Sequence, residues 1–483
     1  MTAAAKGGWQ RVTQPLAEWC ATASVDDLPD EVVATVKLVT LDGIGCALFG
    51  PTTPWGRIVA DFVRTEASRP EVRLWGAGGF RTSAADAALV HGTYIHAFEM
   101  DDVHPVAVIH LASQVLPAAF AMVELRAAAA RGDRSRPEVP PIPVDGHELL
   151  QALAVGMEVG SRIGMVTGAR QLARGFHPSP NTGVFATAAT AARLLRLDPQ
   201  TTAHALGIAG SGGGALMAAQ YGAMVKRVHA GFSARAGVVA ALLAARGLTG
   251  TPNVLESPYG GFARALADVE DVSDVLADLG SRWMLLGVQI KAYPCCGSNH
   301  TSIDALRSIL AERPDLRPED VDHIEVRCTT ATWHHVGWPY QPNGILAAQM
   351  NLAYTLAALL VDRALFVEQF AEDRLADPRI LALVSRIRVV PDPNLDRLGR
   401  EGRHTVELTL VTQDGRCYRR RVTHARGSRN NPLSYEEVMA KYERLAAPVV
   451  GREAALAVRD GVLACEEQAD VAALIPYLAP KVP

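Results

Sequence analysis

AALVHGTYIHAFEMDDVHPVAVIHLASQVLPAAFAMVE, residues 87–124, sets four histidines and three acidic residues within the twenty positions 91–110, among small and apolar side chains. These polar residues are His91, His96, Glu99, Asp101, Asp102, His104 and His110. The small and apolar neighbours predict burial, and buried polar groups must be paired or put to use. Imidazoles beside carboxylates can supply a base, an acid or metal ligands. We therefore expect the chemistry of this chain to lie in this segment.

Helical patterns extend outward from this segment, over residues 15–279, and predict a mainly α fold. Ala, Leu, Val and Gly dominate a chain of 483 residues that is 49% hydrophobic and only 6% aromatic, which favours closely packed helices. Residues 321–330, 385–392, 404–412 and 416–424 alternate as strands do, and Gln413-Asp414-Gly415 predicts a hairpin between the last two. The sequence thus predicts a large helical domain (1–283), an inserted smaller α+β domain (284–424), and C-terminal helices (425–483) that return to the first domain.

Charge and cysteine content exclude several classes of protein. A formal net charge of −4 gives no sign of nucleic-acid binding. No apolar run reaches the roughly 18 residues of a membrane span, so no membrane contact is expected. The first residues lack a secretory signal, and the seven scattered cysteines include no CxxC pair. We expect a cytoplasmic protein with free thiols and without a zinc ribbon or an iron–sulfur cluster.

A metal site is the main alternative interpretation of the histidine segment. His96, Glu99, Asp101 and His104 could bind a divalent ion. HExxH is absent, however, and acids in such loops often cap a helix. We predict no metal and no cofactor.

Three further clusters carry polar residues in apolar surroundings. His177 precedes a helix opened by Asn181, and a helix N-terminus suits a carboxylate ligand. Lys226, Arg227 and His229 form a basic turn, which could hold an anion or could be solvated. Lys291 comes where the helical region ends, and ligand sites favour such junctions.

Two other features receive a structural interpretation. Cys295 and Cys296, close after Lys291, are predicted to be two small buried thiols rather than a redox pair. The glycine-rich segment 207–218 lacks the signature of a phosphate loop, and close helix packing accounts for it better.

Taken together, six motifs in this order resemble the MmgE/PrpD family, which includes 2-methylcitrate dehydratases, cis-aconitate decarboxylases and iminodisuccinate epimerases. The resemblance covers nearly the whole chain. It is carried by LDGIGCALFG (41–50), HGTYIHAFEMDDVHPVAVIHLASQVLPAA (91–119), GFHPSPNTGVFATAATAA (175–192), KRVHAGFSARAGVVAALLAARGLTG (226–250), KAYPCCGSNHTSIDAL (291–306) and QMNLAYTLAALLVDR (349–363). It implies a helical domain with an inserted α+β lid, a homodimer, and no metal.

The resemblance also implies which residues form the site. The catalytic positions are His110, His177, Lys226, Asp101 and Tyr354, and the substrate-binding positions are Glu99, Asp102, Arg227, His229 and Lys291. Two positions of the motif EMDDV, residues 99–103, depart from the family pattern. Glu99 stands where the family usually has Asp, and Val103 stands where it usually has Thr. Both changes argue against cis-aconitate as the substrate.

The resemblance implies a lyase that removes a proton next to a carboxylate in a di- or tricarboxylic acid, most simply a dehydration like that of 2-methylcitrate. His110 and His177 are the candidate acid and base, and the two lysines would hold substrate carboxylates. The carboxylate of Asp101 or Glu99 would orient an imidazole, and Tyr354 would donate a hydrogen bond. Epimerisation, decarboxylation and carboxylate binding without turnover stay open.

Overall fold

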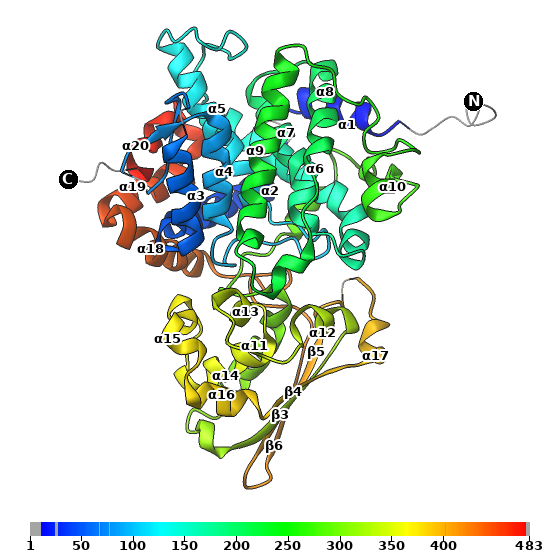
Figure 1. Cartoon of the computed structure of the whole chain (residues 1–483), viewed down its shortest axis with the longest axis vertical. Coiled ribbons are helices and arrows are strands. Elements are labelled where there is room, and N and C mark those ends of the chain that lie inside the picture. Colours follow the sequence, from blue (N-terminus) through cyan, green and yellow to red (C-terminus); the bar gives the residue numbers. More distant parts are fainter. Residues whose placement is uncertain (1–10, 25–27, 67, 77, 401, 480–483) are drawn as a thin grey trace, which may run out of the picture.

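The computed structural model describes residues 11–24, 28–66, 68–76, 78–400 and 402–479. The chain is 59% helix and 8% strand, so the prediction of a mainly α protein is confirmed. Figure 1 shows the helical part at the top and a smaller part with a sheet below it.

The helical part packs small residues between helices, as its Ala-rich sequence predicts. At its centre, helices α4, α5 and α7 all contact α9, α5 also contacts α4 and α7, and α6 covers α7. The helices before residue 284 are α1 (Thr13–Thr22), α2 (Asp30–Phe49), α3 (Pro54–Thr65), α4 (Ala84–Ile95), α5 (Ala112–Ala130), α6 (Gly146–Ala173), α7 (Pro178–Leu194), α8 (Pro199–Ala209), α9 (Val225–Ala245) and α10 (Phe262–Ala267). A short hairpin of β1 (Val72–Arg73) and β2 (Arg81–Thr82) lies between α3 and α4.

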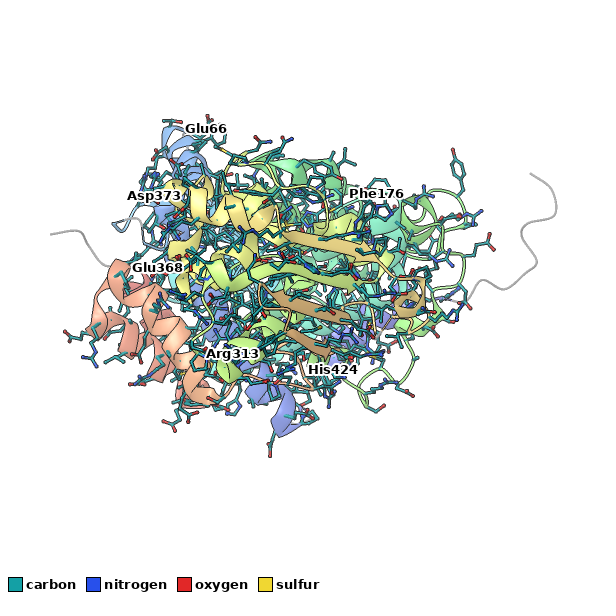
Figure 2. The ribbon with its side chains drawn as sticks, turned by 90° about the horizontal axis from the view of Figure 1, so that it is seen from below. Glu66, Phe176, Arg313, Glu368, Asp373 and His424 are labelled. Atoms are coloured by element: carbon teal, nitrogen blue, oxygen red, sulfur yellow. The ribbon has the colours of Figure 1, made fainter. Side chains whose placement is uncertain are left out.

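The sheet lies in the second part of the chain and has the order β4-β3-β5-β6. The four predicted strands are confirmed as β3 (Val321–Cys328), β4 (Ile387–Pro391), β5 (Val406–Thr412) and β6 (Cys417–Val422). β4 runs parallel to β3, and β5 pairs antiparallel with both β3 and β6, as the predicted hairpin requires. Seen from below, the strands lie side by side, with His424 just beyond β6 (Figure 2).

Helices cover one face of this sheet. α11 (Gly297–Glu312) packs on β5 and β6, and α14 (Leu352–Asp362) packs on β4. Alternate residues of β5, from Val406 to Thr412, are buried, which is the pattern of a strand with one covered face. The remaining helices of this part are α12 (Thr330–Val336), α13 (Ile345–Gln349), α15 (Glu372–Leu375), α16 (Pro378–Val384) and α17 (Pro393–Asp396).

The chain then returns to the helical part. α18 (Tyr435–Val450) and α19 (Arg452–Leu463) both pack against α2, and α20 (Ile475–Leu478) packs on α19. Lys441 of α18 forms a buried ion pair with Asp42 of α2 at 2.6 Å. Helix α2 and the C-terminal helices thus share one core.

Three helices are long and apolar enough to cross a membrane by length and composition: Asp30–Thr52, Gly146–Ala173 and Val225–Ala245. The prediction that no segment reaches this limit was therefore wrong. Between 61% and 89% of each apolar window is buried within the protein. Burial among other helices explains their composition, since a helix that is apolar all round is a core helix or a membrane span.

Glycine permits the closest helix contact, between α4 and α9. A Cβ on Gly92 would lie 2.9 Å from the Cα of Gly231. A Cβ on Gly231 would collide with the Leu89 carbonyl oxygen and the Thr93 hydroxyl. This contact fixes Lys226, at the start of α9, beside the end of α4.

Replacing Gly231 with Ala should lower the free energy of unfolding by about 1–3 kcal/mol, because the added methyl overpacks this contact. Gly213→Ala is the matched control, since its Cβ would meet nothing closer than 3.6 Å and its φ is negative. Thermal unfolding of both variants measures the difference. Equal midpoints for the two variants would show that the helices are not packed this closely.

Candidate active site

The loop between α4 and α5, residues 96–111, is held in an unusual backbone conformation. Glu99 and Val108 have φ values of 57° and 55°, in the left-handed region that side chains rarely adopt. Backbone hydrogen bonds join Val103 to Gln289, at 2.8 and 2.7 Å, and tie the loop to the segment before α11. Such strain persists only where surrounding contacts hold it, and it clusters at functional sites.

Two imidazoles in this loop share one carboxylate. Nδ1 of His96 lies 3.0 Å and Nδ1 of His110 lies 3.4 Å from Oδ2 of Asp101. Nδ1 of His110 also lies 2.6 Å from the carbonyl oxygen of Asp102, so this nitrogen carries the proton and donates it. Nε2 of neutral His110 is then free to accept a proton. Burial lowers the pKa of His110 to about 3, although Asp101 opposes the shift.

The neighbouring Asp102, which is predicted to bind substrate, makes hydrogen bonds within the protein. Its two oxygens accept hydrogen bonds from the backbone N–H groups of Leu111 and Ala112, at 2.8 and 2.9 Å. It therefore caps the start of α5 and does not line the cavity. Burial raises its pKa to about 7, and the nearby charge of Asp101 adds to the shift.

Glu99 is the centre of a buried charge cluster. Its carboxylate lies 2.9 Å from Nζ of Lys226 and 3.2 Å from Nζ of Lys291, and it also contacts the guanidinium of Arg227. Burial would raise the pKa of Glu99, but the three cations hold it well below its usual value. The side chain of Arg227 turns away from the cavity, onto Gln349 at 2.6 Å and the ring of Trp55.

His177 and His229 form a second imidazole pair, with their Nδ1 atoms 3.0 Å apart. The ring centroid of His177 lies 6.2 Å from that of His96, so the two pairs are neighbours. Burial and the charge of Lys226 hold the pKa of His177 well below its usual value. The pKa values of all four imidazoles, His96, His110, His177 and His229, are lowered by burial, so the four rings are neutral at neutral pH.

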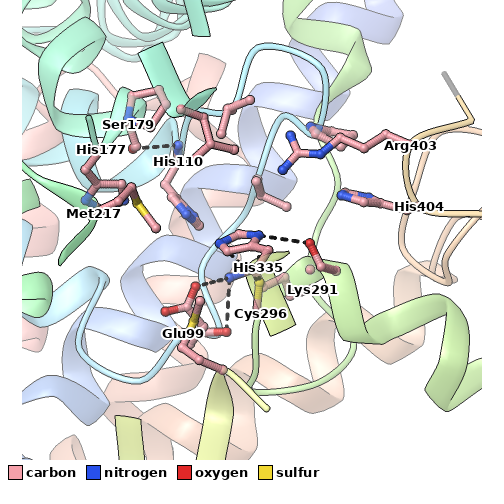
Figure 3. Close-up of a pocket in the computed structure, with 18 of the residues that line it drawn as sticks. Glu99, His110, His177, Ser179, Met217, Lys291, Cys296, His335, Arg403 and His404 are labelled. Carbon is pink, nitrogen blue, oxygen red and sulfur yellow. Dashed lines mark hydrogen bonds and ion pairs between the residues drawn. The ribbon is translucent and has the colours of Figure 1, made fainter. Parts of the chain in front are cut away.

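A cavity lies where these groups meet the sheet-containing part. Of the predicted residues, Glu99, His110, His177, Lys226 and Lys291 line it. Figure 3 shows Arg403 and His404 on one side of the cavity, with Glu99, His110 and His177 on the other. Asp101 stands behind His110, and His229 stands behind His177 and lines a neighbouring pocket.

Tyr354, predicted to be catalytic, is not among the described residues that line this cavity. Its hydroxyl donates to the carbonyl oxygen of Gln369 at 2.7 Å, and its ring packs against Tyr340 and Phe370. The structure therefore places Tyr354 in the core of the sheet-containing part, away from the other predicted site residues.

Several lining residues were missed by the sequence interpretation: Ser298, His335, Arg403 and His404. Arg403 is the most informative of these, because its side chain has no hydrogen bond or ion pair within the described part of the chain, and its Nε is buried. Nothing in the sequence distinguishes Arg403 from Arg397 and Arg400 in the same arginine-rich loop. Of these three arginines, the folded structure places Arg403 alone at the cavity.

A metal ion fits this site poorly. Atoms of His96, Glu99 and His110 lie within 4.8 Å of one another, which is close enough for shared ligation. Glu99 is already paired with three cations, however, and these would repel a divalent ion. His104, another predicted ligand, instead lies 2.9 Å from the Met284 carbonyl oxygen through Nε2.

Comparisons with known proteins agree with the resemblance seen in the sequence. The MmgE/PrpD N-terminal domain matches residues 14–274, and the MmgE/PrpD C-terminal domain matches residues 293–466. A cis-aconitate decarboxylase from Aspergillus terreus is 32% identical over 97% of this chain and 96% of its own. The cis-aconitate decarboxylase-like protein oryM from Aspergillus oryzae is 32% identical over 97% of each chain. The human cis-aconitate decarboxylase is 28% identical over 91% of this chain and 88% of its own.

Replacing Glu99 with Gln should lower the free energy of unfolding by about 3–5 kcal/mol, because buried cations lose their counter-charge. The matched control is Glu368→Gln, which breaks an exposed pair with Arg444 and should cost about 1 kcal/mol or less. Chemical denaturation of both variants measures this difference. A Glu99→Gln variant as stable as the control would contradict the charge cluster.

Proposed function

Because the chain belongs to the MmgE/PrpD family, we propose that it is a lyase acting on a small unsaturated tricarboxylic or dicarboxylic acid, with cis-aconitate the first substrate to test. The single observation that carries this proposal is a cavity that combines free imidazoles with cations in excess over carboxylates. The names of the relatives support decarboxylation over the dehydration expected from the sequence.

The charge balance of the cavity favours an acid with several carboxylates. Glu99 offsets one of the three positive charges around it, so Lys226 and Lys291 together still attract anions. Arg403 adds an unpaired positive charge on the opposite wall. We infer that one substrate carboxylate lies toward the lysines and another toward Arg403, with the reacting carbons between them.

The reaction then requires one proton transfer. In cis-aconitate, a proton adds to the alkene CH carbon, which is the alkene carbon farther from the CH₂ group. The bond from the CH₂ group to its carboxylate breaks, and its electron pair forms the new alkene as carbon dioxide leaves. His110 and His177 are the imidazoles that can deliver the proton, and bound carboxylates would raise their depressed pKa values toward neutrality.

Glu99 and Val103 bear on the choice of acid. Glu99 keeps the negative charge that an Asp would supply, and its longer side chain still reaches all three cations. Val103 places methyl groups on the cavity wall where the family usually has a hydroxyl. This loss favours, as the alternative, dehydration of an acid with an apolar branch, of which 2-methylcitrate is an example.

Residues 284–424 supply Ser298, His335 and Arg403 to the cavity. We propose that this part acts as a lid, so that its movement opens the cavity to substrate and its closure excludes water. Location in the cytoplasm and assembly into a homodimer remain part of the proposal.

Turnover should require both the imidazole of His110 and the positive charge of Lys226. With cis-aconitate, carbon dioxide release should fall at least about 100-fold in His110→Asn and Lys226→Ala. His323→Asn, which alters an exposed histidine of β3, is the control and should keep the wild-type rate. Proton NMR of the products separates decarboxylation from dehydration and epimerisation. Wild-type rates in either site variant would overturn the assignment.

Arg403→Leu should raise KM at least about tenfold, because it removes the unpaired cation that would hold a substrate carboxylate. Arg397→Leu alters an exposed arginine of the same loop and should leave KM unchanged. Steady-state kinetics with whichever acid is turned over measure both variants. An unchanged KM in Arg403→Leu would exclude this residue from substrate binding.

A further inference from the structure

Cys296 lies at the N-terminal end of a helix and faces the cavity. It immediately precedes α11, a helix of 16 residues, as its N-cap residue. Helix N-termini carry a partial positive charge and stabilise a thiolate. Cys296 was predicted to be a small buried thiol. It is buried, but its side chain also lines the cavity.

An imidazole from another helix completes a pair with this thiol. Sγ of Cys296 lies 3.7 Å from Nδ1 of His335, which stands near the end of α12. The hydroxyl of Ser298 lies 3.1 Å from the same nitrogen and holds the ring in place. This is the arrangement in which an imidazole takes the proton of a thiol and leaves a nucleophilic thiolate.

The electrostatics of Cys296 agree with this geometry and separate it from its neighbour. Burial alone would raise its pKa, but His335 outweighs burial and lowers the pKa to about 7. The adjacent Cys295 is buried without such a partner, and its pKa is raised well above the usual value. The two vicinal thiols therefore differ in reactivity, and only Cys296 lines the cavity.

The surroundings of Cys296 select for anions. Lys226, Lys291 and Arg403 line the same cavity, and each of the three interacts electrostatically with the Cys296 thiolate. A negatively charged electrophile would be concentrated here relative to a neutral one of the same size. Neither the turnover proposed above nor the fold requires a nucleophilic thiol at this position.

We propose that Cys296 and His335 form a covalent capture site for anionic electrophiles, of the chemical class of α,β-unsaturated carboxylic acids. The thiolate sulfur adds to the β-carbon, the alkene electron pair moves to the α-carbon, and that carbon takes the proton held by His335. One S–C bond and one C–H bond form, the alkene π bond and the S–H bond are lost, and nothing leaves. The identity of the natural electrophile rests on the proposed function, because an unsaturated acid would be its substrate or product. The reactive thiol does not rest on it.

The test compares two alkylating probes that differ in charge. The whole protein is treated with iodoacetate or with iodoacetamide, and labelling of each cysteine is followed by mass spectrometry. Cys417 is the internal reference, because it is the exposed cysteine among seven free thiols. The ratio of the iodoacetate rate to the iodoacetamide rate should be at least about tenfold higher at Cys296 than at Cys417.

The pH dependence and two variants complete the experiment. Since the thiolate is the reactive form and the pKa of Cys296 is lowered from 9.0 to about 7, labelling should rise through pH 7 and level off near pH 8. His335→Gln should shift this rise to higher pH, whereas His334→Gln, at the preceding position, should not. Propane-1,2,3-tricarboxylate should slow the labelling of Cys296 and leave Cys417 unchanged.

The failure of this proposal can be distinguished from failure of the proposed function. Equal probe ratios at Cys296 and Cys417, or an unshifted pH profile in His335→Gln, would overturn the capture site even in an active decarboxylase. Selective labelling in a protein that turns over no tested acid would support the capture site alone. Incubation with itaconate should add its full mass to Cys296 and not to a Cys296→Ser variant, and absence of this adduct would remove unsaturated acids from the proposal.

Discussion

The structure depends on the neutralisation of one buried carboxylate. Glu99 lies in a left-handed turn of the loop between α4 and α5, and it binds Lys226 and Arg227 from α9 and Lys291 from the segment before α11. Charges buried without partners are strongly destabilising, so these three segments are held together wherever the chain is folded. The excess of cations over carboxylate then leaves the cavity positive. The same contacts that fix the fold also prepare an anion-binding site.

The two parts of the chain contribute different chemistry to that site. The helical part supplies His110, His177 and Lys226, and the position of Lys226 follows from the close contact of α4 with α9 at Gly92 and Gly231. The sheet-containing part supplies Arg403, His335 and the thiol of Cys296. Because the cations lie on opposite walls, a small acid bound in the cavity would contact both parts. Binding and closure of the proposed lid would then be coupled.

Sequence patterns predicted the helical part, the four strands and five of the cavity residues, because each feature is marked locally. His110, Lys226 and Lys291 are polar residues within apolar segments, and burial of such residues demands a function or a partner. Asp102 is also a polar residue within an apolar segment, yet it caps a helix. Composition alone does not distinguish a capping residue from a residue that binds a ligand. Arg403 and His335 carry no such marking. They reach the cavity only through the packing of the sheet-containing part on the helical part, which no local pattern encodes.

A crystal structure of the protein with propane-1,2,3-tricarboxylate bound would test this account most directly. We predict that the ligand lies between Arg403 and the lysines, within reach of Nε2 of His110, and that Glu99 keeps its contacts with Lys226 and Lys291. A ligand bound elsewhere, or a Glu99 side chain turned away from both lysines, would contradict it.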